Sequence, residues 1–158
     1  MKTSLVWFYL FIGLTVLLFL LVPRDRILRL LLFGLIAGFG LAFILQYGAV
    51  NIFRWWKFNY ALIEIYGAPL GVSLSWIPAV IIFAYFWPLA VSRLGQLIYL
   101  IFFAVGTTIV EYSFVIFGYR EYINWNVLLT FCLAFIVHLL LAFYLYLTTA
   151  KKPMSTSR

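Results

Sequence analysis

Glu111 is the residue whose position most favours a functional role. It is the only charged side chain in the apolar run Ile98 to Phe117 (IYLIFFAVGTTIVEYSFVIF). Insertion scales put the cost of an acidic residue at the middle of a membrane helix at about 2.5 to 3.5 kcal/mol. Such a residue usually faces a partner, water or a substrate path. Glu111 is therefore the first candidate for a site.

Polar and charged groups near Glu111 would define its chemistry. On a helix, Thr107 and Thr108 lie four and three residues before Glu111 and share its face. Glu111 lies roughly 9 Å from the predicted outer end of this helix. A cation that reaches it would keep the carboxylate charged, whereas desolvation alone would favour the neutral acid. The cations predicted on that side of the membrane are Arg54, Lys57 and Arg120.

His138 and Glu64 are the other candidate polar residues. Helical spacing places His138 roughly 10 Å deeper than Glu111, so a direct hydrogen bond between them is not expected. We interpret His138 as a neutral, hydrogen-bonded structural residue, with a proton relay through water as the alternative. Glu64 is the best second acid for a membrane enzyme acting on lipid headgroups. Asp25 and Glu121 adjoin arginines, and charge neutralisation explains them.

The composition indicates how such residues are positioned. The chain has 158 residues, of which 67% are hydrophobic, 22% aromatic and 9% charged. An ordinary soluble domain has a charged fraction of about a quarter, so we predict an integral membrane protein. The net charge of +7 comes from basic residues at the ends of apolar runs. This placement indicates contact with the bilayer and its anionic lipids rather than with nucleic acid.

Five apolar segments are each long enough to cross a bilayer as a helix. We therefore predict an all-α bundle of five transmembrane helices in a single domain over residues 1–150, followed by a disordered cytoplasmic tail over 151–158. Lysine and arginine number seven on one predicted side and four on the other. This excess predicts a plasma-membrane protein with its N-terminus outside and its C-terminus in the cytoplasm. The predicted spans are 4–22, 27–50, 69–92, 95–117 and 125–147.

The segment 51–66 (NIFRWWKFNYALIEIY) separates the second and third spans. Its polar positions fall at helical spacing on a narrow stripe, which predicts an amphipathic helix lying in the membrane interface. A tilted extension of the second span is the alternative. The stripe consists of Arg54, Lys57, Ala61 and Glu64.

Two further patterns concern helix packing. Gly34, Gly38 and Ala42 recur at intervals of four residues, which lets another helix of this chain or of a partner approach closely. Pro78 lies within the third span, where it removes a backbone donor and is expected to kink the helix. A discontinuous helix at a transport site is the alternative interpretation of Pro78. We expect Cys132 to be a small buried apolar residue.

The usual catalytic and cofactor motifs are missing from the sequence. It contains no HExxH, GxSxG or GxxxxGK[ST] motif. One cysteine and one histidine exclude a disulfide, a cysteine metal cluster and bis-histidine haem ligation within one subunit. We expect no metal or cofactor.

Four motifs carry a resemblance to a known group of proteins. The sequence resembles small uncharacterised multi-spanning membrane proteins of spore-forming Gram-positive bacteria. The resemblance implies a bacterial plasma-membrane location and carries over no catalytic residue. The motifs are Trp76-Ile77-Pro78, Phe86-Trp87-Pro88, Thr107-Thr108-Ile109-Val110-Glu111 and Tyr122-Ile123-Asn124-Trp125-Asn126.

These patterns lead to three hypotheses about function. The first is a non-enzymatic membrane protein with a structural or interaction role, in which Glu111 makes a buried polar contact between helices. The second is a small transporter or lipid-handling protein, a homo-oligomer, with Glu111, Thr107 and Thr108 lining an outward-facing polar cavity. The third is the membrane enzyme acting on lipid headgroups. Beyond the bilayer, a second copy of the chain or another membrane protein is the expected partner.

Overall fold

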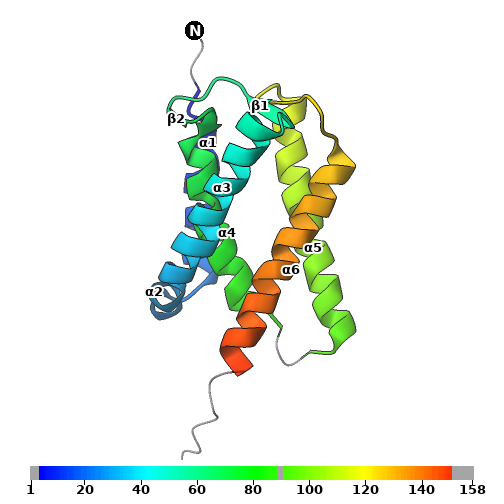
Figure 1. Ribbon diagram of the computed structural model, residues 1–158. Helices are drawn as coiled ribbons and strands as arrows, with labels where there is room; N and C mark the ends of the chain where they lie inside the picture. Colours follow the sequence, from blue (N-terminus) through cyan, green and yellow to red (C-terminus); the bar gives the residue numbers. More distant parts are fainter. Residues whose placement is uncertain (1–3, 89–90, 151–158) are drawn as a thin grey trace, which may run out of the picture.

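The computed structural model describes residues 4–88 and 91–150, with residues 149 and 150 described by their backbone only. Within these ranges, five continuous helices lie side by side and two short β-ribbons cover one end of the bundle (Figure 1). The second helix contains α2, η1, α3 and η2, where η1 and η2 are π-helical segments. The helices are α1 (Val6–Leu21), α2 (Arg24–Phe33), η1 (Gly34–Gly40), α3 (Leu41–Tyr47), η2 (Gly48–Ile52), α4 (Leu70–Phe86), α5 (Arg93–Ile116) and α6 (Val127–Ala150).

Three of the helices are long and apolar enough to cross a membrane, which indicates insertion in a bilayer. They span Arg24–Ile52, Arg93–Ile116 and Val127–Thr148, with 29, 24 and 22 residues. Helices α1 and α4 are apolar but contain 16 and 17 residues. At 1.5 Å per residue they are roughly 24 to 26 Å long, which is shorter than a hydrocarbon core of about 30 Å. Three candidate spans are thus established, and the number five stays a prediction.

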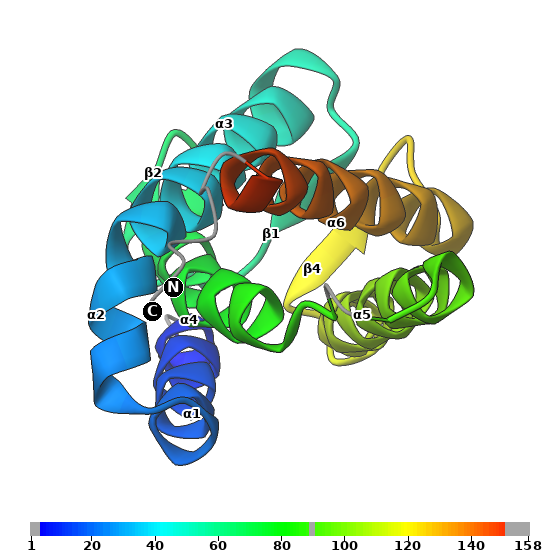
Figure 2. The same ribbon diagram turned by 90° about the horizontal axis from the view of Figure 1, so that it is seen from below.

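Helix α4 is the centre of one group of helices. It packs against α1 and η1, whereas α5 packs mainly against α6, as the end-on view shows (Figure 2). The small residues predicted to permit close approach lie against α4. A Cβ on Gly34 would lie 2.8 Å from Cγ1 of Ile81, and one on Gly38 would lie 2.7 Å from the carbonyl oxygen of Trp76. Ala42 is fully buried. The helix that approaches this stripe therefore belongs to the same chain.

Helix α4 continues through Pro78 from Leu70 to Phe86. Pro78 is buried within it, and the hydroxyl of Ser75 donates to the carbonyl oxygen of Val72 at 2.6 Å. The alternative interpretation of a discontinuous helix at this position is therefore wrong, because the helical backbone extends on both sides of the proline.

The prediction of an interfacial helix over 51–66 is wrong. The second helix ends at Ile52, and the following part of the chain contributes short strands to β-ribbons, while the fold as a whole is helical as predicted. Trp56 and Phe58 are buried while Lys57 between them is exposed, a strand period of two rather than a helical period. The backbone also has positive φ angles at Arg54, Tyr60 and Tyr66, which no helix accommodates. The strands are β1 (Trp56–Phe58) with β4 (Arg120–Tyr122), and β2 (Glu64–Ile65) with β3 (Ala68–Pro69).

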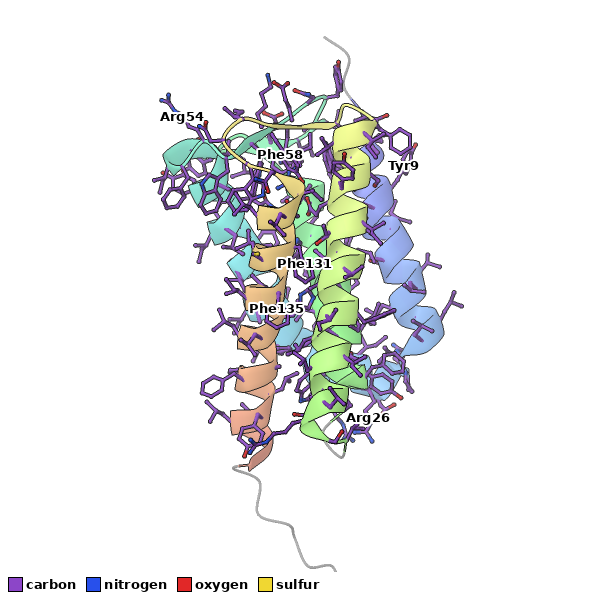
Figure 3. All side chains as sticks on the ribbon, turned by 90° about the vertical axis from the view of Figure 1, so that its right-hand side faces the viewer. Tyr9, Arg26, Arg54, Phe58, Phe131 and Phe135 are labelled. Carbon is purple, nitrogen blue, oxygen red and sulfur yellow. The ribbon has the colours of Figure 1, made fainter. Side chains whose placement is uncertain are left out.

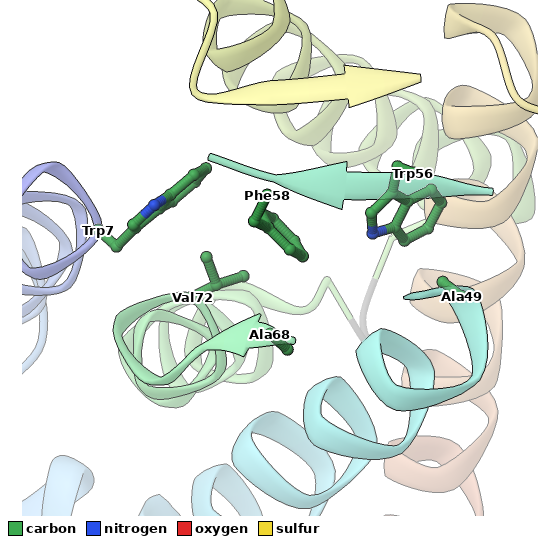
Figure 4. Close-up of a cluster of buried hydrophobic side chains, with 6 residues drawn as sticks. All are labelled: Trp7, Ala49, Trp56, Phe58, Ala68 and Val72. Atoms are coloured by element: carbon green, nitrogen blue, oxygen red, sulfur yellow. The ribbon is translucent and has the colours of Figure 1, made fainter. Parts of the chain in front are cut away.

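The β1–β4 ribbon packs onto the helices through apolar side chains. Strand β1 pairs antiparallel with β4 and directs Phe58 toward the start of α4, where Val72 lies, and Trp56 toward Ala49 of the second helix (Figure 4). Trp7 of α1 joins them, with its ring centroid 5.2 Å from that of Phe58 and 4.7 Å from that of Phe114. This cluster connects α1, α4, α5 and the ribbon at one end of the molecule.

Gly38 and Gly40 provide a matched test of the close contact between η1 and α4. Gly38→Ala should lower the free energy of unfolding by about 1 to 3 kcal/mol, because the new methyl group would meet the backbone of Trp76. Gly40→Ala should have little effect, since its Cβ would lie 3.7 Å from the nearest atom. Thermal unfolding of both variants in one detergent measures the difference. Equal melting temperatures would contradict the close contact of Gly38 with α4.

Candidate functional site

Glu111 forms an ion pair with Arg120, one of the three cations predicted to lie on its side of the membrane. Glu111 lies on α5 and Arg120 on β4, and Gly118 between them has a φ of +76°, a conformation that allows the chain to turn at the end of α5. The side chain of Arg120 is 2% exposed and that of Glu111 is 16% exposed. Both charges are therefore largely removed from solvent and depend on each other.

Aromatic rings cover the guanidinium of Arg120. Its Cζ atom lies 4.0 Å from the ring centroid of Trp56, 5.3 Å from that of Phe58 and 5.8 Å from that of Tyr122. The closest of these positions is a favourable cation–π contact. Burial lowers the pKa of Arg120 to about 9, so the guanidinium still carries its charge at neutral pH. In the described part of the chain, Nε of Arg120 has no hydrogen-bond partner.

Hydrogen bonds fix the aromatic side chains around this ion pair. The indole Nε1 of Trp56 donates to Oε1 of Gln46 on α3 at 3.1 Å. The indole Nε1 of Trp125 donates to Oγ1 of Thr130 on α6 at 2.9 Å, and the hydroxyl of Tyr122 shares a hydrogen bond of 2.9 Å with the same oxygen. These contacts connect the ribbon to the second helix and to α6. We refer to Glu111, Arg120, Trp56, Gln46 and Thr130 as the ion-pair cluster.

A small cavity of about 30 Å³ adjoins the ion-pair cluster. A water molecule needs roughly 10 to 15 Å³ measured in this way, so the space accepts about two waters. Its polar lining provides both donors and acceptors for them. The lining residues are Leu45, Gln46, Trp56, Trp76, Thr107, Glu111, Arg120, Trp125, Thr130, Leu133, Ala134 and Val137.

A larger cavity of about 270 Å³ lies between α1, α4, α5 and α6. Its walls are mainly apolar, and three of its residues, Trp76, Thr107 and Glu111, also line the small cavity. Pockets for small molecules usually measure about 300 to 1,000 Å³, so this one lies near the lower limit. The lining residues are Leu10, Leu14, Leu17, Ser75, Trp76, Ala79, Val80, Ile82, Phe102, Phe103, Gly106, Thr107, Val110, Glu111 and His138.

His138 is buried at the wall of the larger cavity. Its Nδ1 donates to the carbonyl oxygen of Ala134 at 2.7 Å, and its ring packs against Phe83 and Phe103 at centroid distances of 5.1 and 5.8 Å. No hydrogen bond joins it to Glu111 in the described residues, although both line the same cavity. Its hydrogen bond is therefore to its own helix.

The remaining candidates lie outside this centre. Thr108 is buried, donates to the carbonyl oxygen of Ala104 at 2.7 Å, and lines neither cavity. Lys57 pairs with Glu121 at 2.9 Å across the ribbon, with both side chains about half exposed. Glu64 is exposed on β2 and lines neither cavity.

Two other residues are exposed, Arg54 and Cys132. Arg54 projects at the ribbon end (Figure 3) and lines neither cavity. Cys132 is exposed rather than buried, because the face of α6 that carries Ala134, Val137 and His138 turns inward instead. The prediction of a buried cysteine is wrong.

Sequence reasoning missed Trp56, Gln46 and Thr130. The signal for Trp56 was the alternation of Trp56, Lys57 and Phe58, but three residues are too few to outweigh a helical stripe. No periodic pattern marks Gln46 or Thr130, since their hydrogen bonds to Trp56, Tyr122 and Trp125 form only where the ribbon folds back onto the helix ends.

No protein-family model, no curated protein and no solved structure matches this chain. The fold and the site define a helical protein with three helices that can cross a membrane and an ion pair buried beneath a β-ribbon at one end.

Arg120 and Lys57 allow a buried and an exposed ion pair on the same ribbon to be compared. Arg120→Met should lower the free energy of unfolding by about 3 to 5 kcal/mol, because Glu111 would remain without its counter-charge. Lys57→Met should lower it by about 1 kcal/mol or less, since exposed pairs contribute little. Thermal unfolding in the same detergent tests both variants. If both variants lowered the free energy of unfolding by similar amounts, burial would not explain a difference in the strength of the two ion pairs.

Proposed function

We propose that this chain is a non-enzymatic, multi-pass membrane protein with a structural or interaction role. The buried ion pair of Glu111 and Arg120 carries this proposal. Its charges are directed at each other, and the aromatic rings over Arg120 occupy space through which a substrate would reach the guanidinium. A pair enclosed in this way is suited to fixing the positions of structural elements.

The elements that the ion-pair cluster connects support this interpretation. Helix α4 packs with α1 and η1, α5 packs with α6, and the two groups have limited backbone contact along the bundle. At the ribbon end, Arg120 brings β4 onto α5, and β4 pairs with β1. Trp56 of β1 then bonds to Gln46 of α3. The cluster therefore joins the two helix groups and holds the ribbon end ready for contact with a partner.

We further propose five membrane crossings in the plasma membrane, with the ribbon end outside. Exposed arginines near the starts of α2 and α5 support this orientation, because basic residues favour the cytoplasmic side. Arg26 lies at the end of the bundle opposite Arg54 (Figure 3). The charge on Arg120 is paired within the protein, which leaves fewer free cations at the ribbon end. The arginines near the helix starts are Arg24, Arg26, Arg29 and Arg93.

Glu111→Gln tests the structural role. The variant keeps the side-chain size but leaves the buried guanidinium of Arg120 without a counter-charge, so the free energy of unfolding should fall by about 3 to 5 kcal/mol. The double variant Glu111→Gln with Arg120→Met should be more stable than Glu111→Gln alone, because no buried charge remains. Thermal unfolding and size-exclusion chromatography measure both. A Glu111→Gln protein that stays folded with an unchanged melting temperature would refute the role.

Cysteine labelling tests the proposed crossings. In a Cys132→Ala background, Arg54→Cys should react with a membrane-impermeant maleimide added to intact cells. Arg93→Cys should react only after the membrane is permeabilised. The reverse pattern would invert the orientation, and labelling of both positions from one side would exclude an odd number of crossings between the residues.

A further inference from the structure

The larger cavity has the size and walls of a site for a short hydrocarbon chain. Its volume is about 270 Å³. An engineered apolar cavity of 150 Å³ holds benzene, with six carbons, so by proportion this space accepts roughly ten carbons. Apolar residues from three helices form most of the surface, and the wall from α1 consists of Leu10, Leu14 and Leu17.

The cavity reaches the outer surface of the helices. Leu17, Phe102 and Val110 line it and are also 41%, 70% and 42% exposed. Phe102 and Val110 belong to α5, one of the helices that can cross a membrane, so their exposed sides face acyl chains once α5 is inserted. A molecule dissolved in the bilayer can therefore enter from the side without disturbing the ribbon end.

His138 gives the cavity a specific hydrogen-bonding requirement. Because Nδ1 bonds to a carbonyl oxygen, it carries the ring proton, and Nε2 of the neutral ring is an acceptor. No hydrogen bond to Nε2 is seen in the described part of the chain. Two other polar groups of the wall are engaged, since Ser75 donates to Val72 and Glu111 pairs with Arg120, while Trp76 Nε1 is a donor and cannot replace His138 as an acceptor. An occupant that supplies an O–H donor would satisfy Nε2.

We propose that this cavity binds a single-chain lipid alcohol from the bilayer, with roughly ten carbons of its chain between α1, α4 and α5 and its hydroxyl donating to Nε2 of His138. The packing of Phe83 and Phe103 against the imidazole holds the acceptor in place. This site is independent of the structural role of the ion pair, because the hydroxyl contacts His138 and not Arg120.

Photo-crosslinking of the full chain in phosphatidylglycerol vesicles tests the proposal. The probe is a ten-carbon alcohol that carries a diazirine near the end of its chain, and crosslinked residues are mapped by mass spectrometry. We expect crosslinks on the cavity-lining residues of α1, α4 and α5. Unlabelled decanol should compete about fivefold better than methyl decanoate, which lacks the donor, a ratio that corresponds to one hydrogen bond of about 1 kcal/mol. Crosslinks spread evenly over the lipid-facing surface would overturn the proposal.

Two glycines provide a matched pair of variants. A Cβ on Gly106 or on Gly13 would meet no atom within 4 Å, so both positions accept a larger side chain. Only Gly106 lines the cavity. Gly106→Leu should fill it and reduce crosslinking at least fivefold, whereas Gly13→Leu should leave the yield unchanged. Equal yields from the two variants would refute binding in the cavity.

His138→Phe tests the hydrogen bond separately. The variant keeps an aromatic ring between Phe83 and Phe103 but removes the acceptor, so decanol and methyl decanoate should compete equally well. A ratio that stays near fivefold would exclude His138 as the acceptor. If decanoic acid competed more strongly than decanol in the unmodified protein, the ligand would be a fatty acid, and the proposal of a lipid alcohol would be wrong. Melting temperatures of all variants distinguish these results from a failure of the ion-pair cluster, which would lower stability without changing the ratio of the competitors.

Discussion

The ion pair between Glu111 and Arg120 is the interaction on which the ribbon end depends. Removing two charges from water is costly, and the pair is stable only where the geometry and the surrounding groups compensate for the lost hydration. Trp56 meets part of this requirement by covering the guanidinium at 4.0 Å. Trp56 is itself fixed by Gln46, so a polar residue of α3 supports a charge on β4. The β1–β4 ribbon thus stabilises the charges of Glu111 and Arg120 in addition to making apolar contacts with the helices.

Helix α4 explains why the rest of the bundle is unevenly packed. Gly34 and Gly38 bring η1 so close that a side chain on either glycine would collide with α4. In the described residues no comparably close backbone approach draws α5 toward α1, although Trp7 and Phe114 meet at the ribbon end, and the larger cavity lies between the two helices. In water such an apolar space would be costly, whereas in a bilayer the surrounding acyl chains are as apolar as the leucines that line it. A helical bundle in a membrane can therefore be stable with close packing on one side of α4 and a cavity on the other.

The sequence predicted the helices and the position of Glu111 because both depend on local composition. Long apolar runs predict helices whatever their neighbours are, and a single carboxylate within one of them requires a partner. Arg120 was one of three cations within reach, but its choice depends on β4 pairing with β1, in which Trp56 faces Tyr122. That pairing joins residues far apart in the sequence through strands of three residues each. Strands this short give too few alternating residues to outweigh the stripe from Arg54 to Glu64, whose spacing is that of a helix. The prediction of an interfacial helix failed for this reason.

Glu111 and His138, both within the helical bundle, meet the same constraint in different ways. Glu111 lies near the end of α5, where a cation from the ribbon reaches it. His138 lies deeper, where no cation is in contact with it in the described structure, and it bonds to the backbone of its own helix. A buried carboxylate needs a counter-charge. A neutral imidazole needs only a partner for its N–H donor and a partner for its acceptor nitrogen. Because the carbonyl oxygen of Ala134 accepts from Nδ1, the acceptor Nε2 of His138 is left without a partner at the wall of the larger cavity in the described structure. Glu111 thus has its partner within the protein, whereas His138 can complete its hydrogen bonding with a molecule from the bilayer.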